Sequence, residues 1–186
     1  MAPGVGVGPA LNGTQRVFYA LWPDAEVRSA LAQTSRRMHG VLQGRRTRDD
    51  SIHLTLAFLG EVNVDRLPVL LAPPQDLFPA AFTLALDEWG CWSRNGIGWA
   101  GPSHTPAGLR DLVANLQAWL RVAGFDLERR AFLPHVTLIR KAQCATLPAL
   151  GPQVSWPVGE CVLVRSTRAR TGSCYEVIGR WPLSRN

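Results

Sequence analysis

The chain has 186 residues, of which 46% are hydrophobic and 18% charged, so it can bury the core of one globular domain. No apolar run approaches the ~18 residues of a membrane span, and the start of the chain lacks the basic-then-apolar pattern of a secretory signal. We therefore expect a cytoplasmic protein with no membrane partner. The net charge is +6, nearly all of it from arginine, which permits a nucleic acid partner without proving one.

The cysteines are Cys91, Cys144, Cys161 and Cys174. They form no CxxC pair, which argues against a zinc site. Disulfides are uncommon in the cytoplasm, so we expect all four side chains to be reduced and mostly buried.

The first half of the chain opens with a Gly-, Pro- and Ala-rich segment, residues 1–15, which we expect to be a disordered leader. Arg16 to Trp22 is apolar on both faces, which predicts a central strand. Asp24 is the expected N-cap of a helix that ends at Gly40. The charged segment Arg45 to Asp50 is either a contact for a polyanion or a solvated loop.

The second half continues as alternating short strands and helices. The expected elements are a short helix at Val64 to Leu71, a strand at Ala81 to Asp87, a hairpin turn at Asn95-Gly96, a helix capped by Thr105 that ends at Gly124, a Pro-rich link from Pro148 to Pro157, and a hairpin of Glu160 to Ser166 with Tyr175 to Trp181.

Two of the four histidines lie in the same frame of His, aliphatic, Thr, aliphatic: His53-Leu54-Thr55-Leu56 and His135-Val136-Thr137-Leu138. Each frame lies in an apolar run typical of a strand, where residues two apart share a face. Each His and Thr should therefore point away from the core together. One copy alone would be explained by a structural histidine, but the repeat favours two similar lobes whose His-Thr pairs meet in one cleft.

We therefore predict an α+β fold of two pseudo-symmetric lobes, mostly antiparallel sheet with helices on the outside, and an active-site cleft between them. The expected order of elements contains the unit of a helix followed by a His-Thr strand twice. A single bilobal domain should span residues 16–183, with 184–186 as a tail.

The paired motif favours general acid and base catalysis over metal chemistry. A catalytic zinc site wants three protein ligands, and only two histidines recur, each followed by a poor zinc ligand. Imidazole titrates near ~6.5, so one ring can be neutral while the other is protonated. Rings on opposite walls suit in-line cleavage of a phosphodiester, and Thr hydroxyls can donate to its nonbridging oxygens. We expect no metal and no cofactor.

Four segments resemble the 2H phosphoesterases, and among them the bacterial and archaeal RNA 2′,3′-cyclic phosphodiesterases, also called 2′-5′ RNA ligases. The likeness runs from about Arg16 to Leu183. The segments are Phe18 to Pro23, His53 to Glu61, Arg130 to Arg140 and Tyr175 to Trp181.

This resemblance implies hydrolysis of a terminal 2′,3′-cyclic phosphate of RNA to a 2′-phosphate, without metal. It implies that His53 is the proton donor and His135 the proton acceptor, and that phosphate is bound by Thr55, Thr137 and Arg140. Phe58 would stack on the terminal base, at ~1–3 kcal/mol. RNA ends or small cyclic nucleotides are the expected partners of a protein that acts as a monomer without an obligate protein partner.

Phe58 and Arg140 each lie five positions after their histidine. Regular alternation would point both toward the core, and they reach the cleft only if the strands end, twist or bulge near Ala57 and Ile139. Other readings remain open: 2′-5′ RNA ligation, another substrate such as an ADP-ribose cyclic phosphate, and a noncatalytic module that binds RNA ends.

Overall fold

The computed structural model describes residues 13–128, 130–147, 151, 153–169 and 172–184. The expected leader therefore lies mostly outside the described residues, although Thr14 and Gln15 already belong to the first strand. Ser184, expected in the tail, is also ordered and forms a parallel bridge with Ala80. No helix in the described ranges is both long and apolar enough to cross a membrane.

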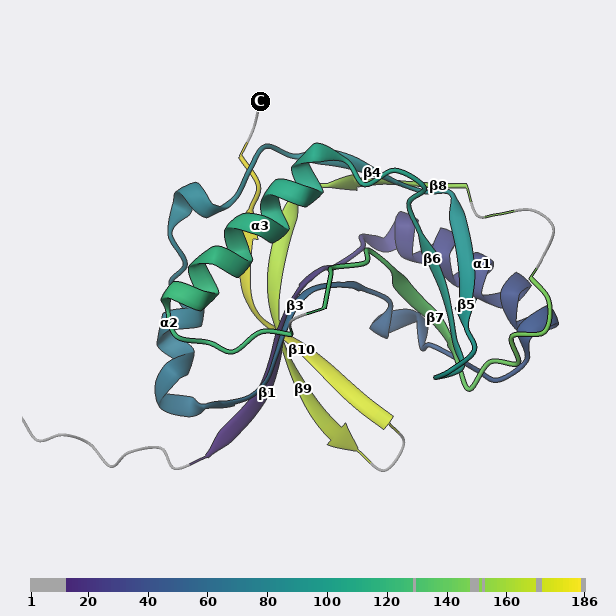
Figure 1. Cartoon of the computed structure of the whole chain (residues 1–186), viewed down its shortest axis with the longest axis horizontal. Coiled ribbons are helices and arrows are strands. Elements are labelled where there is room, and N and C mark those ends of the chain that lie inside the picture. Colours follow the sequence, from purple (N-terminus) through teal and green to yellow (C-terminus); the bar gives the residue numbers. More distant parts are fainter. Residues whose placement is uncertain (1–12, 129, 148–150, 152, 170–171, 185–186) are drawn as a thin grey trace, which may run out of the picture.

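The fold is α+β and mostly antiparallel, as predicted (Figure 1). The helices are α1 (Ala25–Leu42), α2 (Leu67–Leu71) and α3 (Ala107–Val122), with 3-10 turns η1 (Asp49–Ser51), η2 (Val64–Arg66) and η3 (Gln75–Leu77). The strands are β1 (Thr14–Leu21), β2 (Arg45–Arg46), β3 (Leu54–Asn63), β4 (Phe82–Leu86), β5 (Glu88–Trp92), β6 (Ile97–Gly101), β7 (Val136–Arg140), β8 (Val154–Val158), β9 (Glu160–Ala169) and β10 (Gly172–Pro182).

One sheet runs through the molecule in the order β10-β9-β1-β3-β7-β6-β5, with β2 paired to β7. We call β10, β9, β1 and β3 the His53 half, and β2, β7, β6 and β5 the His135 half. A single rung joins the halves, because β3 and β7 pair only at Leu54 and Val136. Beyond that rung the two halves diverge, which is the bilobal arrangement that the repeat predicted (Figure 1).

The two large helices hold the halves together because each packs on the half that does not contain the next His-Thr strand. α1 precedes β3 but packs against β7, where the Ser35 hydroxyl donates to the Leu138 carbonyl at 3.2 Å. α3 precedes β7 but packs against the His53 half, with Trp119 edge-on to Tyr19 at 6.2 Å. The helix-plus-strand repeat seen in the sequence is therefore interleaved, and one core of buried side chains runs under both halves.

Several predicted boundaries are corrected by local geometry. Asp24 caps α1 as expected, accepting from the Val27 amide at 2.9 Å, but the helix continues through Gly40. The N-cap of α3 is Pro106 rather than Thr105. The expected Pro-rich link contains a strand, β8, which pairs with β4 in a separate two-stranded sheet.

The expectation of four reduced cysteines is wrong for one pair. Cys91 and Cys144 form a disulfide, while Cys161 and Cys174 are free. Their sequence separation of 53 hid the pairing. Antiparallel pairing of β5, β6 and β7 folds the end of β5 back toward the segment that follows β7, and so brings the two residues together.

Candidate active site

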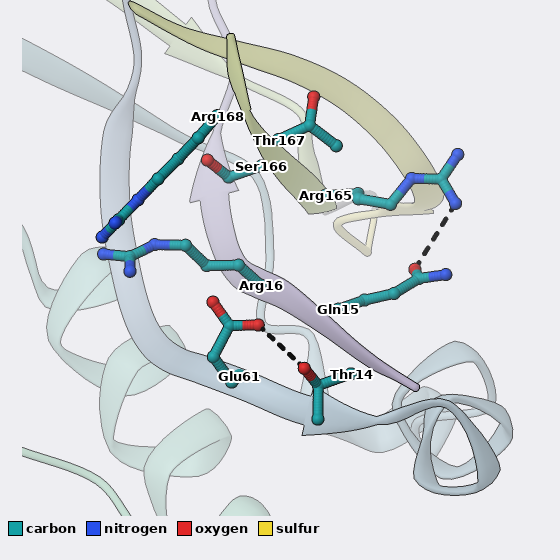
Figure 2. Close-up of a pocket in the computed structure, with 8 residues that line it drawn as sticks. All are labelled: Thr14, Gln15, Arg16, Glu61, Arg165, Ser166, Thr167 and Arg168. Atoms are coloured by element: carbon teal, nitrogen blue, oxygen red, sulfur yellow. Dashed lines mark hydrogen bonds between the residues drawn. The ribbon is translucent and has the colours of Figure 1, made fainter. Parts of the chain in front are cut away.

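Two surface pockets lie beside the motif histidines rather than around them. One, of about 310 Å³, is lined by residues of β1, β3 and β9 (Figure 2). The other, of about 320 Å³, is lined by residues of α3 and by Phe132 and Pro134. Because neither pocket includes His53 or His135, we describe the motif site from the strands that build it.

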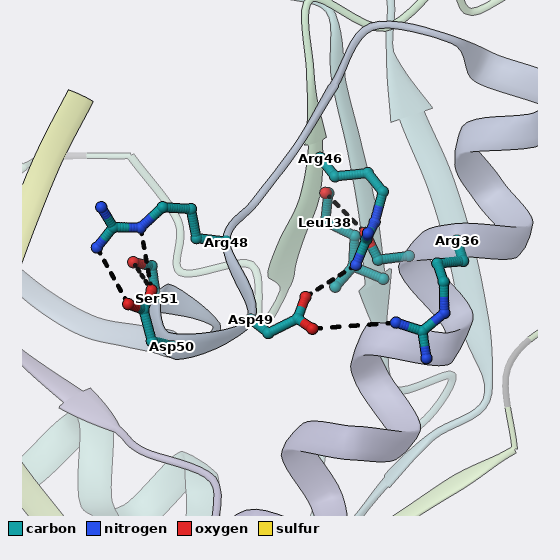
Figure 3. A network of polar contacts seen from close by, with 8 residues as sticks. Arg36, Arg46, Arg48, Asp49, Asp50, Ser51 and Leu138 are labelled. Carbon is teal, nitrogen blue, oxygen red and sulfur yellow. Dashed lines mark hydrogen bonds and ion pairs between the residues drawn. The ribbon is translucent and has the colours of Figure 1, made fainter. Parts of the chain in front are cut away.

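His53 is held by a short turn just before β3. Its Nδ1 lies 2.8 Å from the carbonyl oxygen of Ser51, the last residue of η1. The Ser51 hydroxyl donates to the Asp50 carboxylate at 2.8 Å, and Arg48 pairs with the same carboxylate (Figure 3). These contacts lower the pKa of Asp50, first through the Ser51 hydroxyl. The turn that presents the Ser51 carbonyl is thus fixed by its own charges.

The same network pairs several charges of the segment Arg45 to Asp50. Besides the Arg48 pair, Asp49 pairs with Arg46 at 2.8 Å and approaches Arg36 of α1 at 3.9 Å (Figure 3). These carboxylates already balance arginines of the segment. Both interpretations of the segment, a contact for a polyanion and a solvated loop, stay predictions.

His135 repeats this arrangement just before β7. Its Nδ1 lies 2.8 Å from the carbonyl oxygen of Leu133, again two residues earlier. A carbonyl only accepts, so in both rings Nδ1 carries the hydrogen and donates it. That fixes the neutral tautomer with a bare Nε2, which is the atom left to exchange a proton with a ligand.

The single rung between β3 and β7 brings the two motifs to one place. Leu54 and Val136 are paired and fully buried. Extending this antiparallel register by one residue in each direction places His53 across from Thr137, and His135 across from Thr55. In that extended register each histidine would face the threonine of the other motif, whereas the pairing itself is formed only at Leu54 and Val136.

The strands bulge at the fourth residue of each motif, which answers the question raised by Phe58 and Arg140. Between β1 and β3, Ala20 pairs with Thr55 and Tyr19 with Ala57, so Leu56 is unpaired. The same irregularity occurs between β6 and β7, where Leu138 is skipped. At each bulge two consecutive residues are buried, so the alternation of buried and outward-facing side chains resumes one position later along the strand.

The residue five positions after each histidine is therefore turned out of the main core. Phe58 packs with Phe18 in a small second cluster on the outer face of the His53 half. Arg140 is exposed, and its charge lowers the pKa of both His53 and His135. Phe58 and Arg140 thus both lie outside the main core.

His53 sits among aromatic rings that the sequence analysis did not assign to the site. Trp22 stacks on it at 5.2 Å between centroids and 4° between planes. Phe18 lies at 5.0 Å, and Tyr175 is edge-on at 5.2 Å. Burial by these rings lowers the pKa of His53 to about 4, with smaller contributions from Arg140 and His135. The alternation of Phe18, Ala20 and Trp22 was the available signal.

His135 has a more open environment. Trp92, from the end of β5, is edge-on to its ring at 4.6 Å. Burial also lowers the pKa of His135, and the charges of Arg130 and Arg140 act in the same direction. Sequence reasoning missed Trp92 because it lies on a strand of another hairpin, more than forty positions from His135.

Metal ligands are not gathered at this site. In the described part of the chain, no three side chains of His, Cys, Asp or Glu lie together as a metal would require. Of the other histidines, His39 contacts the Gly44 carbonyl and His104 contacts Ser103, both on the exposed surface. The expectation of metal-free chemistry stays a prediction.

Comparison with known proteins extends over nearly the whole chain. The family model described as LigT like Phosphoesterase matches residues 21–99. An RNA 2′,3′-cyclic phosphodiesterase of Escherichia coli (strain K12) is 34% identical over 175 residues, which cover 94% of this chain and 99% of the relative. The chain is a LigT-like phosphoesterase of the 2H family. The family predicted from the two motifs is thereby confirmed.

Two further similarities support the same assignment. An RNA 2′,3′-cyclic phosphodiesterase of Thermus thermophilus is 31% identical over 182 residues, covering 90% of each chain. The crystal structure of E. coli LigT complexed with 3′-AMP superposes with a TM-score of 0.83 at 35% identity, covering 92% of this LigT-like phosphoesterase and 99% of that chain.

Proposed function

We propose that this LigT-like phosphoesterase hydrolyses the terminal 2′,3′-cyclic phosphate of RNA to a 2′-phosphate, with His53 and His135 as proton donor and acceptor and without a metal. The observation that carries the proposal is the pair of matched imidazoles that flank the single Leu54–Val136 rung. Each has its Nδ1 hydrogen held by a carbonyl, and each has Nε2 available. The activity named for the relatives supports the same reaction.

The reaction is an in-line displacement at phosphorus. Nε2 of His135 takes a proton from water as the water oxygen attacks the phosphorus atom, and Nε2 of His53 gives a proton to the departing 3′ oxygen. The new P–O bond forms as the P–O3′ bond breaks, which leaves a 2′-phosphate and a 3′-hydroxyl. Thr55 and Thr137 donate hydroxyl hydrogens to the nonbridging oxygens, and Arg140 balances the charge that develops there.

The electrostatics favour a proton acceptor that is already neutral before the substrate binds. Both rings have lowered pKa values, so both are neutral near pH 7 in the free protein. This suits His135 as proton acceptor. It also means that His53 acquires its proton only when the negative charge of a bound phosphate raises its pKa. Proton donation by His53 therefore depends on binding.

Phe58 and its neighbours provide the nucleoside side of the site. Phe58 packs against the aromatic and aliphatic residues that also surround His53. A base stacked on this ring would be held next to the proton donor. Stacking of this kind tolerates any base, because every base has a π face. The proposal therefore expects little base preference.

Turnover of a 2′,3′-cyclic mononucleotide in excess chelator, with identification of the product, tests this function. The expected result is hydrolysis that survives chelation and yields the 2′-phosphate. A 3′-phosphate product would reverse the roles of the two oxygens, and activity that requires added metal would contradict the mechanism. Tight binding of RNA ends without any turnover would favour the noncatalytic reading.

A joining assay addresses ligation. RNA with a 2′,3′-cyclic phosphate end is mixed with 5′-hydroxyl RNA, and joined product is compared with hydrolysed product over the same time. We expect hydrolysis to dominate, because water is the far more abundant nucleophile. A joined product that forms faster than the hydrolysed one would make ligation the main activity.

A further inference from the structure

We propose that the pocket between β1, β3 and β9 is a second phosphate-binding subsite, which holds an internucleotide phosphate of the RNA chain upstream of the reacting end. The inference rests on the proposed function and extends it from the terminal nucleotide to the polynucleotide. The pocket has a volume of about 310 Å³. Its lining residues are Thr14, Gln15, Arg16, Glu61, Arg165, Ser166, Thr167 and Arg168 (Figure 2).

The side of the pocket formed by Arg16 and Arg168 lies on the same face of the sheet as His53. On β1, Phe18 contacts His53, and Arg16 follows two residues earlier on the same face. At ~3.3 Å per strand residue this is a step of about 7 Å. On β9, Ser166 is directly opposite Arg16, and Arg168 is the next residue on that face. A chain that leaves the His53 site along this face therefore meets these arginines.

Phe58 joins the two regions. The guanidinium of Arg16 lies over the Phe58 ring, with its carbon 4.7 Å from the ring centroid. Phe58 itself packs in the cluster that contains Phe18. Phe58 therefore lies between the residues that surround His53 and the pocket. A nucleotide whose base stacks on Phe58 would have its upstream phosphate directed toward Arg16.

The arginines of the pocket are not equally available. Arg165 pairs with Glu176 and donates to Gln15 at 3.4 Å. In contrast, no ion pair within the described ranges involves Arg16 or Arg168. Figure 2 shows their guanidinium groups pointing to the same side of the pocket, with Arg165 directed to the other.

Two like charges on diagonal positions of neighbouring strands repel each other, and an anion between them removes that repulsion. Arginine suits phosphate because its planar fork of donors matches two phosphate oxygens. Glu61 also lines the pocket, and its carboxylate accepts from the Thr14 hydroxyl at 3.2 Å. Glu61 is directly opposite Arg16 in the β1–β3 register, so its carboxylate offsets part of the Arg16 charge and the subsite depends chiefly on Arg168 of β9.

The test compares substrates of one to four nucleotides, all with a 5′-hydroxyl and a 2′,3′-cyclic phosphate, in excess chelator. The 5′-hydroxyl ensures that internucleotide phosphates are the only additional anions. The variant is Arg168→Gln, because Arg168 is exposed and lies outside the catalytic pair. The control is Arg121→Gln, an exposed arginine of α3 outside the pocket, which removes the same charge.

We expect kcat/KM of the unchanged protein to rise once the substrate has an internucleotide phosphate. Arg168→Gln should lower kcat/KM on the longer substrates about tenfold, as expected for loss of a charged hydrogen bond, and leave the mononucleotide unchanged. The slope of log(kcat/KM) against log salt should become shallower by about 0.7 for one lost phosphate contact. Arg121→Gln should change neither quantity.

An equal effect of Arg168→Gln on every substrate length, or no gain with length in the unchanged protein, would overturn the subsite. Affinity for labelled single-stranded RNA with a 2′-phosphate end keeps the subsite testable if the cyclic mononucleotide is not turned over. In that case the proposed function fails, whereas a tenfold weaker affinity of Arg168→Gln still supports the subsite and an unchanged affinity refutes it.

Discussion

The two halves of the sheet have the same main-chain geometry around the motif histidine, but different side chains surround each imidazole ring. In both, the histidine precedes its strand, donates Nδ1–H to the carbonyl two residues earlier, and is followed by a bulge at the fourth motif residue. His53 is enclosed by three aromatic rings, whereas His135 touches one, that of Trp92.

In the proposed function, the bulges give the two halves different roles toward the substrate. The position that each bulge brings out of the core is Phe58 in one half and Arg140 in the other. A cyclic nucleotide is itself asymmetric, with an aromatic base on one side of its ribose and a charged phosphate on the other. If the proposed roles of Phe58 and Arg140 hold, the two strands serve the two ends of one substrate through a single differing residue after each bulge.

Removing either imidazole should have the largest effect and tests whether the halves act as a pair. We expect His53→Ala and His135→Ala each to lower turnover of a cyclic mononucleotide by about 10²–10⁴-fold, the usual contribution of general acid–base catalysis. His39→Ala and His104→Ala are matched controls and should retain activity. If only one of the two motif variants lost turnover, the two halves would not act as a pair, because one half would have no catalytic role.

Arg140→Ala should have the next largest effect, about 10²-fold on kcat, because one donor to the developing phosphate charge is lost. It should also raise the pKa of both histidines, since the Arg140 charge disfavours both imidazolium forms. The pH dependence of kcat/KM reports both shifts. Arg130→Ala is the matched control and should raise the pKa of His135 alone.

Phe58→Ala should act mainly on binding. Loss of stacking at ~1–3 kcal/mol predicts an increase in KM of about tenfold, with kcat changing much less. Phe58→Tyr keeps an aromatic face and should retain most of the affinity. Steady-state kinetics on a cyclic mononucleotide separates the two parameters. If Phe58→Ala reduced kcat as strongly as Arg140→Ala, the two halves would not divide the substrate as proposed.

The last expected effect is on the pH dependence of stability and not on activity. His53 has a pKa of about 4 in the folded protein, against ~6.5 when unfolded, so between these values the unfolded chain binds more protons. The free energy of unfolding should therefore fall as the pH drops from about 6.5 to about 4. Urea denaturation at several pH values measures it.

His53→Gln should remove most of this dependence, and His135→Gln a smaller part. The carboxylates with lowered pKa values, Asp50 and Asp87, act below about pH 4 and so fall outside this window. A slope that is unchanged in His53→Gln would mean that the His53 ring is not buried in its neutral form.

Prediction from the sequence succeeded where neighbours in the chain decide the structure. The strand of Arg16 to Trp22, the Asp24 cap and the hairpin at Asn95-Gly96 all depend on local alternation or turn chemistry, and all are present. Gly96 indeed has a positive φ of 61°, which glycine adopts at little cost. The 2H family and the α+β fold were also predicted correctly, because the two motifs are local patterns.

Prediction failed where distant segments meet. The Cys91–Cys144 disulfide and the strand β8 both depend on partners many residues away. The aromatic wall of His53 combines Trp22 and Tyr175, which only the β1–β9–β10 pairing brings together.

By itself, the amino-acid sequence determined that two His-Thr strands exist, that each has a buried apolar side, and that their repetition belongs to one family of phosphoesterases. Only the tertiary structure decided that the motifs share a single rung and that Phe58 and Arg140 turn out of the main core. The physical reason is that side-chain alternation follows from the local chain, whereas a bulge arises only when a strand pairs with a neighbour of different register.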